Sequence, residues 1–147
     1  MNSADGTIER ELFIAAKPET IFAFLVDAEK IATWLGVLQQ LDARPDGAFA
    51  VELTQGNIAS GRYTEVVPFR RVAFTWGWQS HDTALAALRP GTSLVEFELE
   101  PKDGGTLLRL RHSRLPRDLH ATHIDRWAFY LGRLKSSVEG RGDVRLW

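Results

Sequence analysis

The sequence contains no cysteine, and this absence excludes two kinds of chemistry. Disulfide bonds cannot form, and no thiolate is present to act as a nucleophile or as a metal ligand. Proteins of the reducing cytosol commonly lack disulfides, so a chain without cysteine fits that compartment. We therefore expect a cytoplasmic protein.

Long apolar runs and a strong net charge are missing as well. No stretch approaches the roughly 20 apolar residues that a membrane-spanning helix needs, and residues 1–11 lack the basic and then apolar order of a signal peptide. The formal net charge is −1, so no global basic field points to nucleic acid or to an anionic membrane. The arginines between Arg109 and Arg117 fit a solvated strand face better than a basic patch. We expect no nucleic-acid partner and no membrane insertion.

The motifs of common catalytic and cofactor-binding sites are also absent. Neither Ser60 nor Ser113 has the glycines two residues before and two residues after it that form a nucleophile elbow. Glycine-rich phosphate loops do not occur. We predict no cofactor and assign no catalytic residue.

Histidines are the remaining candidates for metal binding. His120 and His123 are predicted to share one helix face, and His112 lies near the end of the preceding strand. Three imidazoles can hold zinc, but no carboxylate or other fourth ligand has a characteristic spacing. We therefore predict no metal site. His112 fits a packed, hydrogen-bonded core histidine, and the alternative is that it orients a polar group of a ligand.

The strongest pattern in the sequence lies in residues 71–78. Val72, Phe74, Trp76 and Trp78 alternate with smaller or polar residues. A period of two with bulky residues on one side predicts a half-buried strand. Such a wide aromatic face can line a cavity as well as fill a core.

Turn and cap residues divide the rest of the chain into elements. Pro18 can open a helix at its first position, and Asp27 can cap a second one. Glycine-containing turns then separate antiparallel strands. The predicted elements besides the strand above are a strand at 7–15, helices at 18–26 and 28–35, strands from 38 onward that include 49–53, 61–67, 94–100 and 106–112, and a loop at 79–92. This loop is long enough to hold a helical turn and to act as a lid or rim.

A long helix is predicted to close the chain, with Asp118 as its N-cap and Gly140 as its end. Its apolar stripe has three- and four-residue spacing, with His123 and Tyr130 at the edges. The stripe consists of His120, Ile124, Trp127, Leu131, Leu134 and Val138. Since no repeat or linker interrupts residues 1–147, we expect a single domain.

These elements predict an α+β protein of the helix-grip type. A curved antiparallel sheet of about seven strands would wrap around the long C-terminal helix, with the two short helices plugging one end. A sheet curled around one helix tends to leave space between the two, which is where such folds hold ligands.

Short segments spread over nearly the whole chain carry a family resemblance. In chain order they are Lys17–Phe22, Trp34–Gly36, Arg44–Gly47, Gly61–Tyr63, Val67–Pro68, Phe74–Trp76, Thr106–His112 and Trp127. The chain resembles the SRPBCC (START-like, helix-grip) superfamily, and more narrowly the family homologous to the C-terminal domain of the activator of the heat-shock-protein-90 ATPase. The resemblance implies a helix-grip fold with a ligand cavity. Asp46 and Arg126 stand where the family often has glycine, and Arg126 could narrow or polarise the cavity mouth.

The favoured function is the binding of a small, mostly hydrophobic molecule between the curved sheet and the helix of Trp127. His112 or Tyr63 would offer one polar contact. The residues predicted to line the cavity are Trp34, Phe49, Val51, Tyr63, Phe74, Trp76, Leu110, His112, His123, Trp127 and Leu131.

Two alternatives remain open. An enzyme of the same fold could perform acid–base cyclisation or dehydration of a hydrophobic carbonyl compound, with Glu65, expected on the strand face of Tyr63, and His112 as the acid–base pair. A chaperone-regulating module is suggested by the family name alone, and this chain has no room for the additional N-terminal domain of the full-length activator. Pairing into a homodimer is compatible with all three functions.

Overall fold

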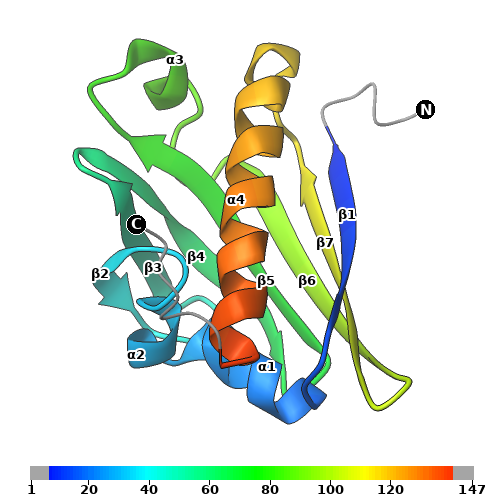
Figure 1. Cartoon of the computed structure of the whole chain (residues 1–147). Helices are drawn as coiled ribbons and strands as arrows, with labels where there is room; N and C mark the ends of the chain where they lie inside the picture. The colour runs from blue at the N-terminus through cyan, green and yellow to red at the C-terminus, as the bar shows by residue number, and fades with distance from the viewer. Residues whose placement is uncertain (1–6, 141–147) are drawn as a thin grey trace.

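The computed structural model describes residues 7–140, and its elements follow the predicted order (Figure 1). In chain order they are β1 (Ile8–Ile14), α1 (Pro18–Val26), α2 (Ala28–Ile31), β2 (Val37–Leu41), β3 (Ala48–Thr54), β4 (Asn57–Val67), β5 (Arg71–Gln79), α3 (Thr83–Ala86), β6 (Ser93–Lys102), β7 (Gly105–Ser113), a 3₁₀ turn (Arg117–Leu119) and α4 (His120–Val138). The strands form one antiparallel seven-stranded sheet in the order β1-β7-β6-β5-β4-β3-β2. The predicted helix-grip architecture is confirmed.

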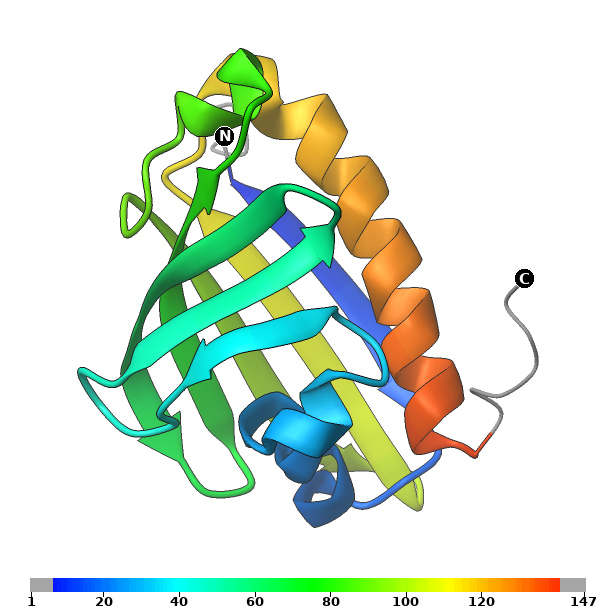
Figure 2. The same ribbon diagram turned by 90° about the vertical axis from the view of Figure 1, so that its left-hand side faces the viewer.

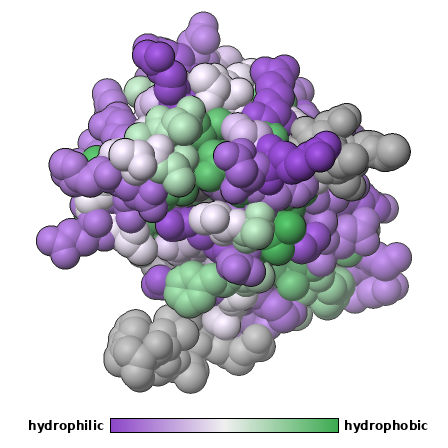
Figure 3. Space-filling model, turned by 90° about the horizontal axis from the view of Figure 1, so that it is seen from above, coloured by the Kyte–Doolittle hydropathy of each residue, from purple (hydrophilic) through white to green (hydrophobic). Residues whose placement is uncertain are grey.

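The sheet curves around α4, which runs across its concave face (Figures 1 and 2). The helices α1 and α2 close one end, and α3 lies at the other end beside the start of α4. The surface at that second end is mostly hydrophilic, with small separate apolar patches (Figure 3). Among the described residues, no helix is both long and apolar enough to cross a membrane.

The alternation in β5 builds the concave face as predicted. Val72, Phe74, Trp76 and Trp78 are each no more than 3% exposed and belong to one buried core. The opposite face of the sheet carries charge. There Arg71 forms ion pairs with Glu65, Glu96 and Glu98 across three neighbouring strands. Such partly exposed pairs each contribute little to stability, so the buried face decides which way the sheet curls.

The beginning of α4 differs from the prediction. Asp118 is not the N-cap, because residues 117–119 form a 3₁₀ turn and the α-helix begins at His120. Leu119 precedes that residue and makes no side-chain cap. The predicted end is confirmed, since Gly140 takes a φ of +83° just after the helix.

The buried stripe of α4 is rotated from the one predicted. It is centred on His123, Trp127, Tyr130, Leu131 and Leu134. His120, Ile124 and Val138 are only half-buried. Spacing alone placed His123 and Tyr130 at the edges, because spacing does not show which polar side chains find hydrogen-bond partners inside the protein. Their hydrogen bonds inside the protein allow them to be buried.

The short helices agree with the sequence, with one difference in length. The side chain of Asp27 accepts a hydrogen bond from the Glu29 backbone N–H at 3.0 Å, which confirms it as the cap of α2. The regular helix ends at Ile31, and hydrogen-bonded turns continue to Leu35. The expected helical turn within residues 79–92 is present as α3.

A β-bulge in β4 overturns the prediction that Glu65 shares a face with Tyr63. The pairing register with β5 shifts between these two residues, so the alternation of faces changes there. Tyr63 is fully buried on the concave side, whereas Glu65 pairs with Arg71 on the convex side at 2.6 Å. An extra residue in one strand leaves no signature in side-chain type, so this bulge could not be predicted from the sequence.

The turn before β3 places an aspartate in a conformation that favours glycine. Asp46 has a φ of +72°, where a Cβ causes a steric cost that glycine avoids. At the next position glycine is required, because a Cβ on Gly47 would lie 1.8 Å from the backbone oxygen of Asp42. The first of the two departures from the family therefore carries backbone strain.

Replacing Asp46 with glycine should raise the free energy of unfolding by up to about 1 kcal/mol, because the strain at positive φ is removed. Urea denaturation of the variant and of the unmodified protein measures this difference. The matched control is Asp125→Gly on the exposed side of α4, which should destabilise because glycine is a poor helix former. A loss of stability in Asp46→Gly would contradict the assignment of strain to this turn.

Candidate functional site

The residues predicted to line a cavity lie together between the sheet and α4. All of them are buried, with at most 5% of each side chain exposed. They come from the turn after α2 (Trp34), from β3 (Phe49, Val51), β4 (Tyr63), β5 (Phe74, Trp76) and β7 (Leu110, His112), and from α4 (His123, Trp127, Leu131). The fold therefore gathers in one interior what the sequence spreads over nearly one hundred residues.

Aromatic rings connect the sheet to the helix without interruption. Phe49 stacks on Phe74 with ring centroids 4.4 Å apart, and Phe74 lies 6.2 Å from Trp76. Trp76 in turn lies 5.3 Å from Trp127 of α4. Offset and edge-on contacts at these distances are favourable beyond the area they bury. The same rings thus hold α4 on the sheet and form the walls of the interior.

A hydrogen bond joins Trp127 of α4 to His112 of β7. The indole N–H donates to Nδ1 of the imidazole at 3.0 Å. The other ring nitrogen, Nε2, lies 2.8 Å from Oγ of Ser93, whose own hydroxyl donates to the backbone oxygen of Trp76 at 2.7 Å. Because the serine proton is already used, His112 must carry its proton on Nε2 and donate it to Ser93. The imidazole is neutral, with both nitrogens engaged.

A second hydrogen bond runs in the opposite sense, from the sheet to the helix. Trp78 of β5 donates its indole N–H to Nε2 of His123 at 3.0 Å. Nδ1 of that histidine lies 2.9 Å from the backbone oxygen of Leu119 and must therefore hold the proton. His123 is neutral too, in the opposite tautomer to His112.

Burial lowers the pKa of both histidines. For His123 the pKa falls to about 4, first because the charged form is desolvated, and further because of the nearby charges of Arg126 and His120, against the raising effect of the Leu119 carbonyl. The pKa of His112 also falls well below its ordinary value, mainly through burial and then through its neighbours His123 and His120. Both imidazoles are therefore neutral at physiological pH.

The clustering of histidines expected from the sequence is present, with the rings of His112 and His123 centred 5.4 Å apart. Their hydrogen bonds use the lone pairs that a metal ion would need. No group of three or more His, Asp or Glu side chains within residues 7–140 has the spacing to hold a metal ion. The arrangement is that of paired core imidazoles.

The acid–base pair considered from the sequence is not assembled. Glu65 lies on the convex face, and His112 lies inside. Tyr63, the other polar candidate, donates its hydroxyl to the backbone oxygen of Leu25 at 3.2 Å, and burial raises its pKa above the ordinary value. Neither carboxylate nor phenolate chemistry is thus brought to the histidines by these residues.

Two participants were missing from the predicted set. Trp78 shared the alternating face, but nothing in the sequence marked it as the donor to His123. Ser93 begins β6 directly after Thr92 and has no distinguishing sequence signal. Arg126, the second departure from the family, lies with its guanidinium carbon 4.9 Å from the Trp78 ring centroid, where it covers this part of the interior.

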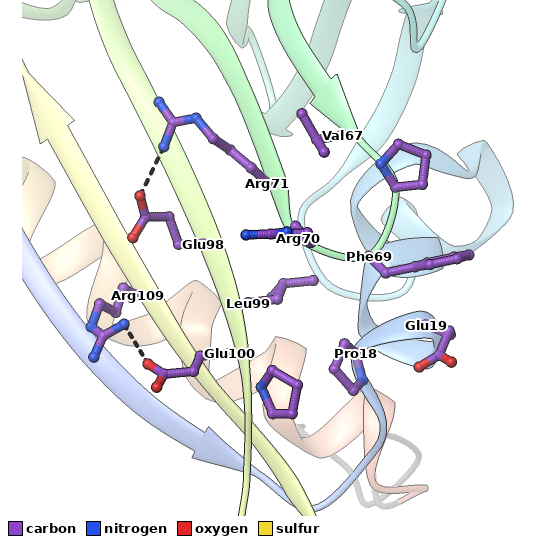
Figure 4. Close-up of a pocket in the computed structure, with 12 residues that line it drawn as sticks. Pro18, Glu19, Val67, Phe69, Arg70, Arg71, Glu98, Leu99, Glu100 and Arg109 are labelled. Atoms are coloured by element: carbon purple, nitrogen blue, oxygen red, sulfur yellow. Dashed lines mark hydrogen bonds and ion pairs between the residues drawn. The ribbon is translucent and has the colours of Figure 1, made fainter.

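A separate hollow of about 970 Å³ opens on the outside of the molecule near the start of α1 (Figure 4). Phe69, Pro18 and Leu99 contribute apolar walls, while the nearby charges are paired as Arg71 with Glu98 and Arg109 with Glu100. Phe69 is 48% exposed and has a φ of +68°, but its ring packs edge-on against Phe22 of α1. This hollow shares none of the residues predicted from the sequence.

Residues 15–139 match the family model described as Activator of Hsp90 ATPase homolog 1-like protein. The chain belongs to this family. The resemblance to this family inferred from the sequence is thereby confirmed.

Three relatives illustrate the range of similarity. An AHSA1-like protein from Rhizobium etli, solved by NMR, is 40% identical, with a TM-score of 0.71 over 92% of this chain and 83% of that one. The Aha1 dimer from Colwellia psychrerythraea is 20% identical, with a TM-score of 0.76 over 92% and 97%, and shows the shared fold. An uncharacterized protein from Schizosaccharomyces pombe is 28% identical over 116 residues, which cover 79% of this chain but only 31% of the yeast protein.

The neutral, buried histidines should make stability fall as the pH falls from about 6.5 to about 4, because the unfolded chain takes up protons there that the folded chain cannot. Each histidine contributes a slope of up to about 1.4 kcal/mol per pH unit. Urea denaturation at about pH 7 and about pH 5 measures it. His123→Gln should flatten the dependence. Equal stability of the unmodified protein at both pH values would contradict the neutral pair.

Proposed function

We propose that this protein binds a small, mostly apolar molecule between the curved sheet and α4. The binding residues would be the eleven predicted from the sequence, with the rings of Phe74, Trp76 and Trp127 as the main walls. Shape and burial would set the affinity, since about 25 cal/mol is gained for each square ångström of apolar surface removed from water.

The observation that carries this proposal is the set of polar groups buried inside an aromatic interior. Ser93, His112 and His123 are each no more than 1% exposed. A core needs no such groups for packing, and desolvating them has a cost that only good hydrogen bonds offset. Groups of this kind with displaced pKa values gather preferentially at binding and catalytic sites.

Binding is favoured over the acid–base alternative because the residues required for proton transfer lie on opposite faces of the sheet. His112 has both nitrogens engaged within the protein, and Glu65 is held by Arg71 outside. A general base must reach the proton that it abstracts. The interior offers apolar and aromatic walls rather than a free base.

Native mass spectrometry of the protein purified from its own host, followed by extraction, should reveal a discrete apolar small molecule. Trp127→Ala should abolish its retention, because it removes the largest wall that α4 contributes. Since truncating a buried tryptophan commonly costs about 3–5 kcal/mol of stability, circular dichroism must first show that the variant is folded. Phe129→Ala, on the exposed side of the same helix, is the matched control and should retain the molecule.

A folded Trp127→Ala variant that keeps the same adduct would contradict the placement of the site. A clean ligand-free mass for the unmodified protein at several concentrations would argue against the proposed function and favour a protein-interaction role. Stimulation of a chaperone ATPase would then be the assay to run, because the family name points to that activity.

The homodimer and the cytoplasmic location stay predictions. The Colwellia relative is described as a dimer, and Val37 and Phe129 give this chain exposed apolar side chains that a second copy could cover.

Light scattering coupled to size-exclusion chromatography should show twice the monomer mass at high protein concentration, with a shift to monomer in Val37→Lys or Phe129→Lys. A monomer mass at every concentration would remove the dimer.

A further inference from the structure

Three of the four indole N–H groups within residues 7–140 donate a hydrogen bond inside the protein. Trp34 donates to the backbone oxygen of Phe24 at 2.8 Å. Trp78 and Trp127 donate to the two histidines at 3.0 Å each. Of the four tryptophans within residues 7–140, only Trp76 has an indole N–H that is buried and lacks a partner.

An unpaired donor at this depth is unusual. Trp76 is 2% exposed, and a buried N–H without a partner is unfavourable because the loss of its hydration is not offset by a hydrogen bond. Two acceptors on residues that contact Trp76 already accept a hydrogen bond from another group. Nδ1 of His112 accepts from Trp127, and Oγ of Ser93 accepts from Nε2 of the same histidine. Buried donors of this kind are normally satisfied by water or by a ligand.

The surroundings of Trp76 indicate which acceptor would fit. The rings around it belong to Phe49, Phe74, Trp78, Trp127 and His112, all centred within 6.2 Å. None of these side chains carries a charge at neutral pH. An anion placed there would lose its hydration without gaining a counter-charge in contact, so a neutral oxygen is the better match.

We propose that Nε1 of Trp76 is the polar anchor of the interior site, and that the ligand is a neutral, ring-containing molecule with one carbonyl or ether oxygen. This inference rests on the proposed function and names the chemical class that the site selects. The flat rings around the indole favour a planar ligand body, because such bodies stack on aromatic walls. The single donor favours one acceptor, because each further polar atom of the ligand would be buried unpaired.

A ligand can enter the interior only by displacing some of the side chains that cover it, because side chains fill the space between the sheet and α4. The segment between β5 and β6, which contains α3, buries Leu85 and Leu88 in the same core as Trp76. The backbone N–H of Trp78 also donates to the carbonyl of Leu88 at 2.8 Å. This segment lies at the end of the sheet opposite α1 and α2 (Figure 2). Leu85 and Leu88 are the apolar side chains that a ligand would displace from the core.

The test uses naphthalene and acetylnaphthalene, which share a ring system and differ by one carbonyl group. Acetylnaphthalene should bind about tenfold more tightly, because one hydrogen bond to a buried donor is worth roughly 1.5 kcal/mol. In ¹H–¹⁵N spectra, the indole signal that is missing in Trp76→Phe should shift when acetylnaphthalene is added to the unmodified protein. Naphthoate should show no such gain, because it is charged.

Variants separate the anchor from the walls. Trp76→Phe removes the N–H but keeps an aromatic ring, so it should retain naphthalene binding and lose the preference for the ketone. Phe129→Ala, on the exposed side of α4, is the matched control and should keep both the binding of naphthalene and the preference for the ketone. Should Trp76→Phe not fold, the Trp76 indole signal can be assigned in the unmodified protein from its nuclear Overhauser contacts to the rings of Phe49 and Trp127, and its shift on adding acetylnaphthalene then decides the matter.

Each outcome distinguishes this inference from the proposed function. Equal affinities for the two neutral probes, with an unmoved Trp76 signal, would overturn the anchor and leave an apolar site standing. A water molecule held permanently by the N–H would give that result. Failure of the unmodified protein to bind either probe would overturn both. Tighter binding of naphthoate would replace the neutral ligand with an anionic one and overturn the chemical class.

Discussion

Two crossed hydrogen bonds between indole and imidazole groups tie the long helix to the sheet. Trp127 of α4 donates to His112 of β7, and Trp78 of β5 donates to His123 of α4. Each element thus supplies one donor and one acceptor, and the two bonds set the rotation of the helix as well as its position. Apolar packing alone would accept neighbouring rotations, since it is not directional. The polar pair explains why the buried stripe of α4 includes a histidine.

The same two bonds determine the chemistry that the interior can support. Each histidine uses one nitrogen to accept and the other to donate, so both are neutral and neither offers a free base or a metal ligand. Protonation of either ring would force its tryptophan donor to face a cationic N–H group. Within residues 7–140, Trp76 is the one tryptophan whose buried indole N–H has no hydrogen-bond partner. An interior with aromatic walls and one donor is suited to recognition of a neutral molecule rather than to proton transfer.

Much of this fold follows from the sequence, because alternation and turn residues act locally. The alternation in β5, the cap at Asp27 and the glycine end of α4 were all predicted and are confirmed. The bulge after Tyr63 was not predictable, because an extra residue in a strand changes the face without changing the residue types. The role of Ser93 was hidden for another reason: its partners are 17 and 19 residues away, and only the pairing of β5, β6 and β7 brings them together. The sequence thus predicted which residues are inside, but not how their polar atoms pair.

The most direct test of this account is the tautomeric state of the two buried histidines, read from ring nitrogen chemical shifts by long-range ¹H–¹⁵N correlation at neutral pH. The crossed hydrogen bonds require the proton of His112 on Nε2 and that of His123 on Nδ1, with each remaining nitrogen unprotonated. That result would establish both indole-to-imidazole bonds at once. A doubly protonated ring at either position, or the same tautomer at both, would contradict the arrangement on which the helix, the neutral interior and the anchor at Trp76 depend.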